Sequence, residues 1–172
     1  MERAATQFVS ILLSLTDARS EFCIFCGLGN NGGDGLAIAR MLTAKGIHAS
    51  VYIISNGGKQ SNDFVTNYNR LQYTDITITE ITHAIQHLSI SPKAVIIDAI
   101  FGSGLNRPLS DLAFNVVKQL NALNNHKIAV DIPSGLFTDK PQEANATVLK
   151  VEDTITFQSP KLQFLFAENE QY

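Results

Sequence analysis

The sequence lacks several features that define common functional classes. It has no cluster of Lys or Arg, and its 172 residues carry a net charge of -3, so we expect no general affinity for nucleic acid. No apolar stretch approaches the roughly 20 residues that a membrane span needs. Residues 1–4 do not have the basic and then apolar layout of a signal peptide, because Glu2 lies among them. We therefore expect a cytoplasmic protein with no membrane partner.

Cysteine is scarce as well, and Cys23 and Cys26 form a single Cys-x-x-Cys pattern. No second pair is present to complete a zinc site. Both residues lie in the apolar run 22–26, and side chains three positions apart on a strand point to opposite faces. We therefore predict buried structural thiols. His83 and His87 have the spacing of a helical metal site, but no third ligand is evident near them, and we interpret this spacing as chance.

Apolar runs and helical spacings alternate along the chain, and 45% of the residues are hydrophobic, which is enough for one well-buried domain over residues 1–172. The predicted strands are 22–26, 49–54, 94–97, 127–130, 146–149 and 154–157. The predicted helices are 4–15, 36–45, 61–71, 79–88 and 111–123. The alternation predicts an α/β fold with a doubly wound, mostly parallel sheet and helices on both faces, a Rossmann-like three-layer sandwich.

A glycine-rich run over residues 26–35 joins the first predicted strand to a helix, a junction that is typical of an anion or nucleotide site. Gly27, Gly29 and Gly32 match G-x-G-x-x-G, but no carboxylate ends the second strand, which disfavours an ordinary NAD-dependent dehydrogenase. The Lys and Ser or Thr of a P-loop are also absent, which excludes an ATPase of that type. Asp34 would either stabilise the helix N-terminus or take part in polar recognition.

Asp98 and Asp131 each follow a predicted buried strand, so they should gather with Gly27 at the carboxyl edge of the sheet. Two converging carboxylates would repel each other, and partial desolvation would raise the pKa of at least one, making it a usable general acid or base. Alternatively, a cation between hard oxygen ligands such as those of Asn31, Asp98 and Ser134 would relieve the repulsion. The residues alone allow both arrangements.

Three segments, Gly-Leu-Gly-Asn-Asn-Gly-Gly-Asp-Gly (27–35), Asp-Ala-Ile-Phe-Gly-Ser-Gly-Leu (98–105) and Val-Asp-Ile-Pro-Ser-Gly-Leu (130–136), closely resemble the NAD(P)H-hydrate epimerase family, or YjeF N-terminal domain. The start Met-Glu-Arg-Ala and the segment Thr-Phe-Gln-Ser-Pro-Lys-Leu (156–162) are also similar to it. The resemblance implies an isomerase that interconverts the R and S epimers of NADHX and NADPHX, in which water has added at C6 of the nicotinamide ring. An S-specific, ADP- or ATP-dependent dehydratase then restores the cofactor, and in many bacteria it is fused to the epimerase.

The resemblance also implies the site residues and partners. Asp131 would lie beside the hydrated ring as the catalytic acid and base, and one potassium ion per subunit would bind Asn31, Asp98 and Ser134. The implied substrate-binding residues are Asn30, Asn31, Gly32, Gly33, Asp34, Gly102, Ser103, Gly104, Leu105, Asn106, Arg107, Pro108 and Asp131. A homodimer is expected, as is the absence of an N-terminal segment and a final C-terminal strand that relatives carry. The alternative is a non-catalytic nucleotide- or protein-binding module of the same fold.

Overall fold

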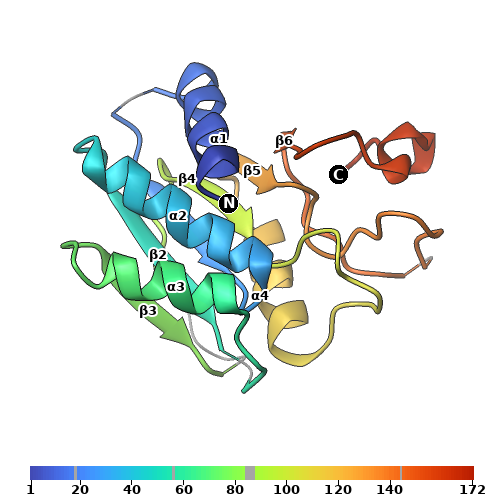
Figure 1. The fold of residues 1–172 in the computed structure, drawn as a ribbon. Helices are drawn as coiled ribbons and strands as arrows, with labels where there is room; N and C mark the ends of the chain where they lie inside the picture. Colours follow the sequence, from blue (N-terminus) through green and yellow to red (C-terminus); the bar gives the residue numbers. More distant parts are fainter. Residues whose placement is uncertain (18, 56, 84–87, 144) are drawn as a thin grey trace.

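A six-stranded parallel sheet forms the centre of the protein (Figure 1) in the computed structural model, which describes residues 1–17, 19–55, 57–83, 88–143 and 145–172. The sheet order is β3-β2-β1-β4-β5-β6, and all of the pairings are parallel. The strands are β1 (Phe22–Cys26), β2 (Ala49–Ile54), β3 (Thr77–Ile81), β4 (Val95–Ala99), β5 (Lys127–Val130) and β6 (Asp153–Ile155). The predicted doubly wound fold is confirmed.

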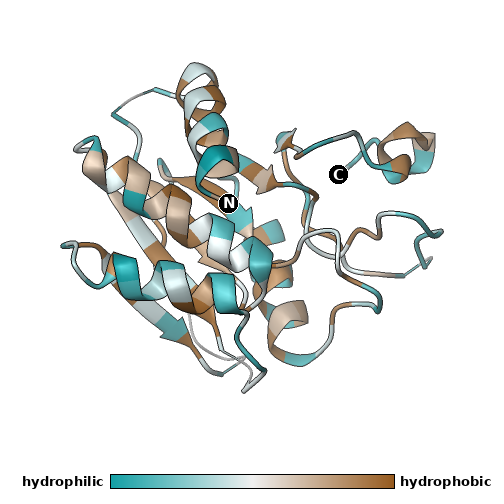
Figure 2. Cartoon of the chain, viewed as in Figure 1, coloured by the Kyte–Doolittle hydropathy of each residue, from teal (hydrophilic) through white to brown (hydrophobic). Residues whose placement is uncertain are grey.

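Helices cover both faces of this sheet, because successive side chains of its central strands point to opposite sides and are apolar on both. Helices α1 (Glu2–Leu15), α2 (Asn30–Ala44) and α3 (Asn62–Leu71) pack on one face, and α4 (Asp111–Asn121) packs on the other. Phe22 and Ile24 belong to the first core, whereas Cys23 and Phe25 belong to the second. Figure 2 shows the central strands mostly in brown and many teal residues on the helices and loops around them.

The strand order reverses between β1 and β4, and glycines allow α2 to approach these two strands closely. A Cβ atom on Gly32 would lie 1.7 Å from the carbonyl oxygen of Gly27, and one on Gly35 would lie 2.5 Å from Cβ of Ala99. The N–H group of Gly27 donates to the Ala99 carbonyl at 3.1 Å. The glycine-rich run therefore fixes the start of α2 against the carboxyl ends of β1 and β4.

The predicted helix over residues 79–88 is wrong where the structure describes it. Residues 77–81 form the edge strand β3, which pairs with β2 in the register Ile54 to Ile81. The segment is rich in β-branched residues, and its pairing with β2 decides the conformation that local periodicity did not. Residues 84–87, including His87, lie outside the described residues, so the interpretation of the His83 and His87 spacing as chance stays untested.

Other boundaries also differ from the predictions. Residues 146–149 are not a strand; Leu149 instead donates its N–H group to the carbonyl of Ser134 at 2.9 Å, outside the sheet. The last strand ends at Ile155 because Phe157 donates its N–H group to the Asp131 carboxylate. Strand β4 extends to Ala99 and so contains Asp98, and α2 already begins at Asn30, within the glycine-rich run.

Cys23 and Cys26 are free and buried, as predicted, and burial raises the pKa of both thiols. They are therefore unreactive packing residues of the central strand. Among the described residues, no helix combines the length and the apolar character that a membrane crossing needs.

Candidate active site

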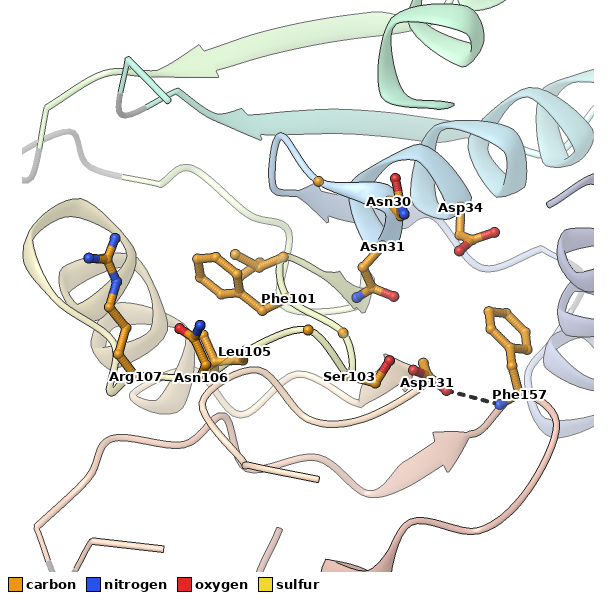
Figure 3. Close-up of a pocket in the computed structure, with 14 residues that line it drawn as sticks. Asn30, Asn31, Asp34, Phe101, Ser103, Leu105, Asn106, Arg107, Asp131 and Phe157 are labelled. Atoms are coloured by element: carbon orange, nitrogen blue, oxygen red, sulfur yellow. Dashed lines mark hydrogen bonds between the residues drawn. The ribbon is translucent and has the colours of Figure 1, made fainter. Parts of the chain in front are cut away.

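A cleft of about 410 Å³ opens at the carboxyl ends of β1, β4 and β5 (Figure 3). Its walls are the start of α2, the loop that follows β4, and the segments that follow β5 and β6. The cleft thus lies at the point where the strand order reverses, which is where open α/β sheets bind their ligands. Its volume lies in the range of roughly 300–1,000 Å³ that is usual for small-molecule sites.

The N-terminus of α2 is suited to an anion. Its N-cap is Gly29, an exposed residue without a side chain that could cap the helix, so the first N–H groups have no side-chain partner there. The helix dipole adds partial positive charge at the same place. Gly29, Asn30 and Asn31 all line the cleft, so a phosphate bound to this helix end would lie inside it.

Asp98 is fully buried and is held by the turn that follows β5. Its Oδ1 accepts from the Ser134 hydroxyl at 2.6 Å and from the Ile100 N–H group at 3.1 Å, and its Oδ2 accepts from the Ser134 N–H group at 2.7 Å. Burial raises the pKa of Asp98 to about 6, although the hydrogen bonds from Ser134 oppose this increase. Within the described part of the chain, Asp98 forms no ion pair.

Asn31 meets the same loop from the other side. Asn31 is 8% exposed and packs on Gly102, where a Cβ atom would lie 3.1 Å from Asn31 Oδ1. The adjacent Phe101 donates its N–H group to the Ser134 hydroxyl at 2.9 Å. The amide nitrogen of Asn31 is buried and has no hydrogen-bond partner among the described residues. Because the two ends of an amide can be exchanged, this side chain could equally present its oxygen there.

The residues of this corner fit a hard cation. Asn31, Asp98 and Ser134 offer an amide, a carboxylate and a hydroxyl oxygen, the donors that alkali and alkaline-earth ions prefer. A cation would also compensate the buried charge of Asp98. No group of three or more His, Cys, Asp or Glu side chains that could hold a metal occurs in the described ranges.

Asp131 lies on the opposite wall and is paired with a lysine. Lys161 Nζ lies 2.8 Å from Asp131 Oδ1, and the same oxygen accepts from the Phe157 N–H group at 3.1 Å and from the Thr156 hydroxyl at 3.4 Å. The backbone of Asp131 has φ +71°, a conformation that only a few per cent of non-glycine residues adopt. Such local strain is frequent at functional sites, where the surrounding contacts maintain it.

Lys161 is not among the site residues predicted from the sequence. Its ammonium also donates to the Phe157 carbonyl at 3.0 Å, so it connects the segment after β6 to the loop after β5. The feature that could have pointed to Lys161 is its position in the segment 156–162, which is part of the family resemblance. No pattern in the sequence links that segment to Asp131, because the contact depends on the pairing of β5 with β6.

Asp34, on the first turns of α2, also faces the cleft. Its Oδ1 is buried and has no hydrogen-bond partner in the described part of the protein. Burial raises the pKa of Asp34 to about 6; the charges of Asp131 and Asp63 raise it further, and the Met1 amino group lowers it. This carboxyl is therefore protonated more readily than an ordinary aspartate.

The structure brings most of the predicted site residues together. The predicted residues that line the cleft are Asn30, Asn31, Asp34, Gly102, Ser103, Gly104, Leu105, Asn106, Arg107 and Asp131. Gly32, Gly33 and Pro108 are not among its lining residues, and Gly33 instead faces the start of α3, where a Cβ atom would lie 3.1 Å from Phe64 N. Asp98 and Ser134 lie beneath the cleft, where Ser134 contacts its lining residue Phe101 and Asp98 accepts from the N–H group of its lining residue Ile100. Arg107 lies at the end away from Asp131 (Figure 3).

Comparisons with known proteins identify the family of this chain. The model of the family described as YjeF-related protein N-terminus matches residues 1–163. An NAD(P)H-hydrate epimerase of Limosilactobacillus fermentum is 34% identical over 172 residues, which are 100% of this chain and 80% of that protein. The bifunctional NAD(P)H-hydrate repair enzyme Nnr of Thermofilum pendens is 34% identical over 94% of this chain and 31% of its own length.

A solved structure supports the fold. The crystal structure of the yeast protein ynu0 superposes on this chain with a TM-score of 0.75, at 22% sequence identity, over 93% of this chain and 70% of that one. At this identity the likeness concerns the fold alone, and it agrees with the sheet and helix arrangement described above.

Proposed function

Because the chain belongs to the family of the YjeF-related protein N-terminus, we propose that it is an isomerase that interconverts the R and S epimers of NADHX and NADPHX. These are nicotinamide cofactors hydrated at C6, and their interconversion is a step of nicotinamide nucleotide repair. One observation carries the proposal: a single cleft unites the uncapped N-terminus of α2, a polar loop and the Asp131 carboxylate, which is paired with Lys161. A nucleotide with a reactive ring needs these parts in one place.

Each part of the cleft has a place in this proposal. The uncapped N-terminus of α2 and the guanidinium of Arg107 would bind phosphate groups, the first through N–H groups and the second through its planar fork. The loop 102–107 would lie along the rest of the nucleotide. The hydrated ring would lie at the other end, beside Asp131 and Phe157 (Figure 3).

Asp131 is the proposed proton-transfer residue. Its contacts to Lys161, Phe157 and Thr156 all involve Oδ1, so Oδ2 is left for the substrate. A protonated carboxyl assists the departure of the C6 hydroxyl as water while the lone pair of the ring nitrogen forms an iminium. The carboxylate then accepts a proton from the water that adds to the other face of C6. General acid-base help of this kind contributes roughly 100- to 10,000-fold.

Potassium is the proposed resident ion, one per subunit, held by oxygens of Asn31, Asp98 and Ser134. Bound there, it would supply positive charge beneath the cleft and favour anionic groups of the substrate. The residues themselves already connect this corner to the substrate loop, since Ser134 holds Phe101 and Asn31 packs on Gly102. A loss of the ion is thus expected to disturb the loop as well.

The proposed partners follow from the reaction. An ADP- or ATP-dependent, S-specific dehydratase would consume the S epimer, and the bifunctional repair enzyme among the relatives combines its functions in one chain.

We also propose that residues 1–172 act as one domain, that the active form is a homodimer, and that the site of action is the cytoplasm.

A coupled assay tests the function. The protein is added to a mixture of NADHX epimers together with an S-specific dehydratase and ATP, and NADH absorbance is followed after the S epimer is exhausted, with potassium present or replaced by sodium. The expected result is a second phase that is faster than spontaneous epimerisation and that depends on potassium. A folded sample that leaves this phase at the spontaneous rate would contradict the proposal and favour a binding module.

A further inference from the structure

The proposed epimerisation moves a hydroxyl group from one face of the nicotinamide ring to the other. A hydroxyl that leaves as water needs a proton donor on its own face, and water that adds on the opposite face needs a proton acceptor there. A side chain on one wall of the cleft reaches one face of a flat ring. Asp131 alone therefore serves half of the reaction well, and the other wall should carry a second proton-transfer group.

Asp131 is arranged to hold negative charge. An ammonium at 2.8 Å and the Phe157 N–H group at 3.1 Å both contact Oδ1, and charge-assisted hydrogen bonds of this kind stabilise a carboxylate. In the described part of the chain, Oδ2 makes no hydrogen bond. Asp131 is thus best suited to accept a proton through its free oxygen.

Asp34 has the opposite surroundings. It comes from α2, on the other side of the cleft from Asp131, and both side chains lie near the Phe157 ring (Figure 3). Its Oδ1 is buried and has no donor among the described residues, and a buried carboxylate without a donor or cation is costly, whereas a neutral carboxyl is tolerated. The charged groups that act on it are the Met1 amino group at the N-cap of α1, Asp63 of α3 and Asp131, and burial has the largest effect on its pKa.

We propose that Asp34 is a second catalytic residue of this site, the proton donor for a hydroxyl that leaves from the α2 side of the ring. This inference rests on the proposed epimerase function. In the forward step the C6–O bond breaks, the Asp34 proton joins the departing hydroxyl to give water, and the ring nitrogen lone pair forms the C=N bond of an iminium. A water molecule then forms a new C6–O bond on the other face and gives its extra proton to Asp131 Oδ2.

The reverse reaction uses the same residues with exchanged roles. Asp131 then gives the proton and Asp34 receives it, so each epimer is bound productively by a different protonation state of the pair. Between two turnovers in the same direction, the proton on Asp131 must be released to water and Asp34 must be protonated again. Two carboxyl groups whose environments favour opposite charge states are suited to this division.

Oxygen exchange separates this role from a structural one. Each purified NADHX epimer is incubated with protein in ¹⁸O-labelled water, and mass spectrometry with chiral separation follows both ¹⁸O uptake at C6 and conversion to the other epimer. In Asp34→Asn we expect epimerisation to fall roughly 100- to 10,000-fold. Exchange with retention should persist for one epimer, because Asp131 can still expel a hydroxyl and return water on its own face. Asp131→Asn should retain exchange for the other epimer only.

Two further variants complete the test. Asp34→Glu keeps a carboxyl on this wall and should epimerise faster than Asp34→Asn. Asp75→Asn removes an exposed carboxylate that does not line the cleft and is not among the charges that act on Asp34, so it should match the wild type. The inference is overturned if folded Asp34→Asn epimerises like Asp75→Asn, or if it loses exchange for both epimers along with epimerisation. A wild type that accelerates neither exchange nor epimerisation would instead contradict the epimerase function itself.

Discussion

The two walls of the cleft surround an aspartate side chain with different groups. On the wall that follows β5, Asp131 Oδ1 receives an ammonium, a backbone N–H group and a hydroxyl. On the α2 wall, Asp34 Oδ1 is buried and receives no hydrogen bond within the described ranges. The residue type is the same, but one environment stabilises the carboxylate and the other favours the neutral acid.

This difference shows how a small α/β domain can provide an acid and a base without histidine in its cleft. The sheet brings both carboxyl groups to one edge, and the neighbouring segments then decide which of them is charged. On the Asp131 wall the decisive neighbour is Lys161, which comes from the segment after β6. Altering one wall at a time therefore tests the comparison directly.

The largest loss of activity on the Asp131 wall is expected when the carboxylate itself is removed. Asp131→Asn keeps the size of the side chain and a residue type that tolerates φ +71°, so folding should be retained. It removes the proposed proton acceptor, and the coupled epimerase assay should show a loss of roughly 100- to 10,000-fold. If the folded variant kept most of its activity, the role of Asp131 would be wrong.

On the same wall, Lys161→Met should have a smaller effect than Asp131→Asn. It preserves most of the stem of a side chain that is 14% exposed, but removes the ammonium 2.8 Å from Asp131. Activity near pH 7 should fall about 10-fold in the coupled assay, because the Asp131 carboxylate loses the cation that stabilises its negative charge. Lys161→Arg should restore activity in part. Lys150→Met, at an exposed lysine outside the cleft, is the control and should match the wild type, and wild-type activity in Lys161→Met would mean that the pair is only structural.

Lys161 also illustrates which part of the site a sequence can predict. Motifs that lie at the ends of strands predicted Asn31, Asp98 and Asp131, because parallel strands bring their carboxyl ends to one edge. Lys161 reaches the site from an irregular segment beyond the last strand. The interplay of Lys161 with Asp131 depends on the parallel pairing of β5 and β6, which has no local signal.

The same distinction holds for the fold. Strands β1, β2 and β5 were predicted with the bounds that the structure shows. β1 and β5 are buried along their whole length, as is typical of central parallel strands, whereas β2 includes partly exposed positions. The segments 77–81 and 146–149 were predicted wrongly. The first becomes an edge strand through its pairing with β2, and the second is held outside the sheet by Ser134.

A third aspartate sharpens the comparison, since Asp98 is fully buried and two of its three hydrogen bonds come from Ser134. Ser134→Ala removes a donor to Asp98 and the acceptor of the Phe101 N–H group, and leaving such buried groups without partners should lower the free energy of unfolding by about 1–3 kcal/mol. It should also raise the potassium concentration needed for half-maximal activity. Urea unfolding and a potassium titration measure the two effects. Ser110→Ala, at a helix N-cap without a side-chain cap bond, is the control and should stay within about 0.5 kcal/mol.

The smallest effect concerns the amount by which the Asp34 carboxylate lowers the free energy of unfolding. Folding raises the pKa of Asp34 from 3.8 to about 6, so the folded chain binds this proton more tightly than the unfolded chain. The contribution of Asp34 to the free energy of unfolding therefore falls as the pH rises from about 4 to about 6, and it stays reduced at neutral pH.

Replacing this carboxyl by an amide removes that penalty. We expect Asp34→Asn to raise the thermal midpoint by about 1–3 °C at pH 7 and to leave it nearly unchanged close to pH 4, because solvent reaches part of the side chain and limits the gain. Thermal melts of both proteins across this pH range measure the difference. An equal shift at both pH values would mean that packing, and not the charge of an unpaired carboxylate, distinguishes the α2 wall from the wall of Asp131.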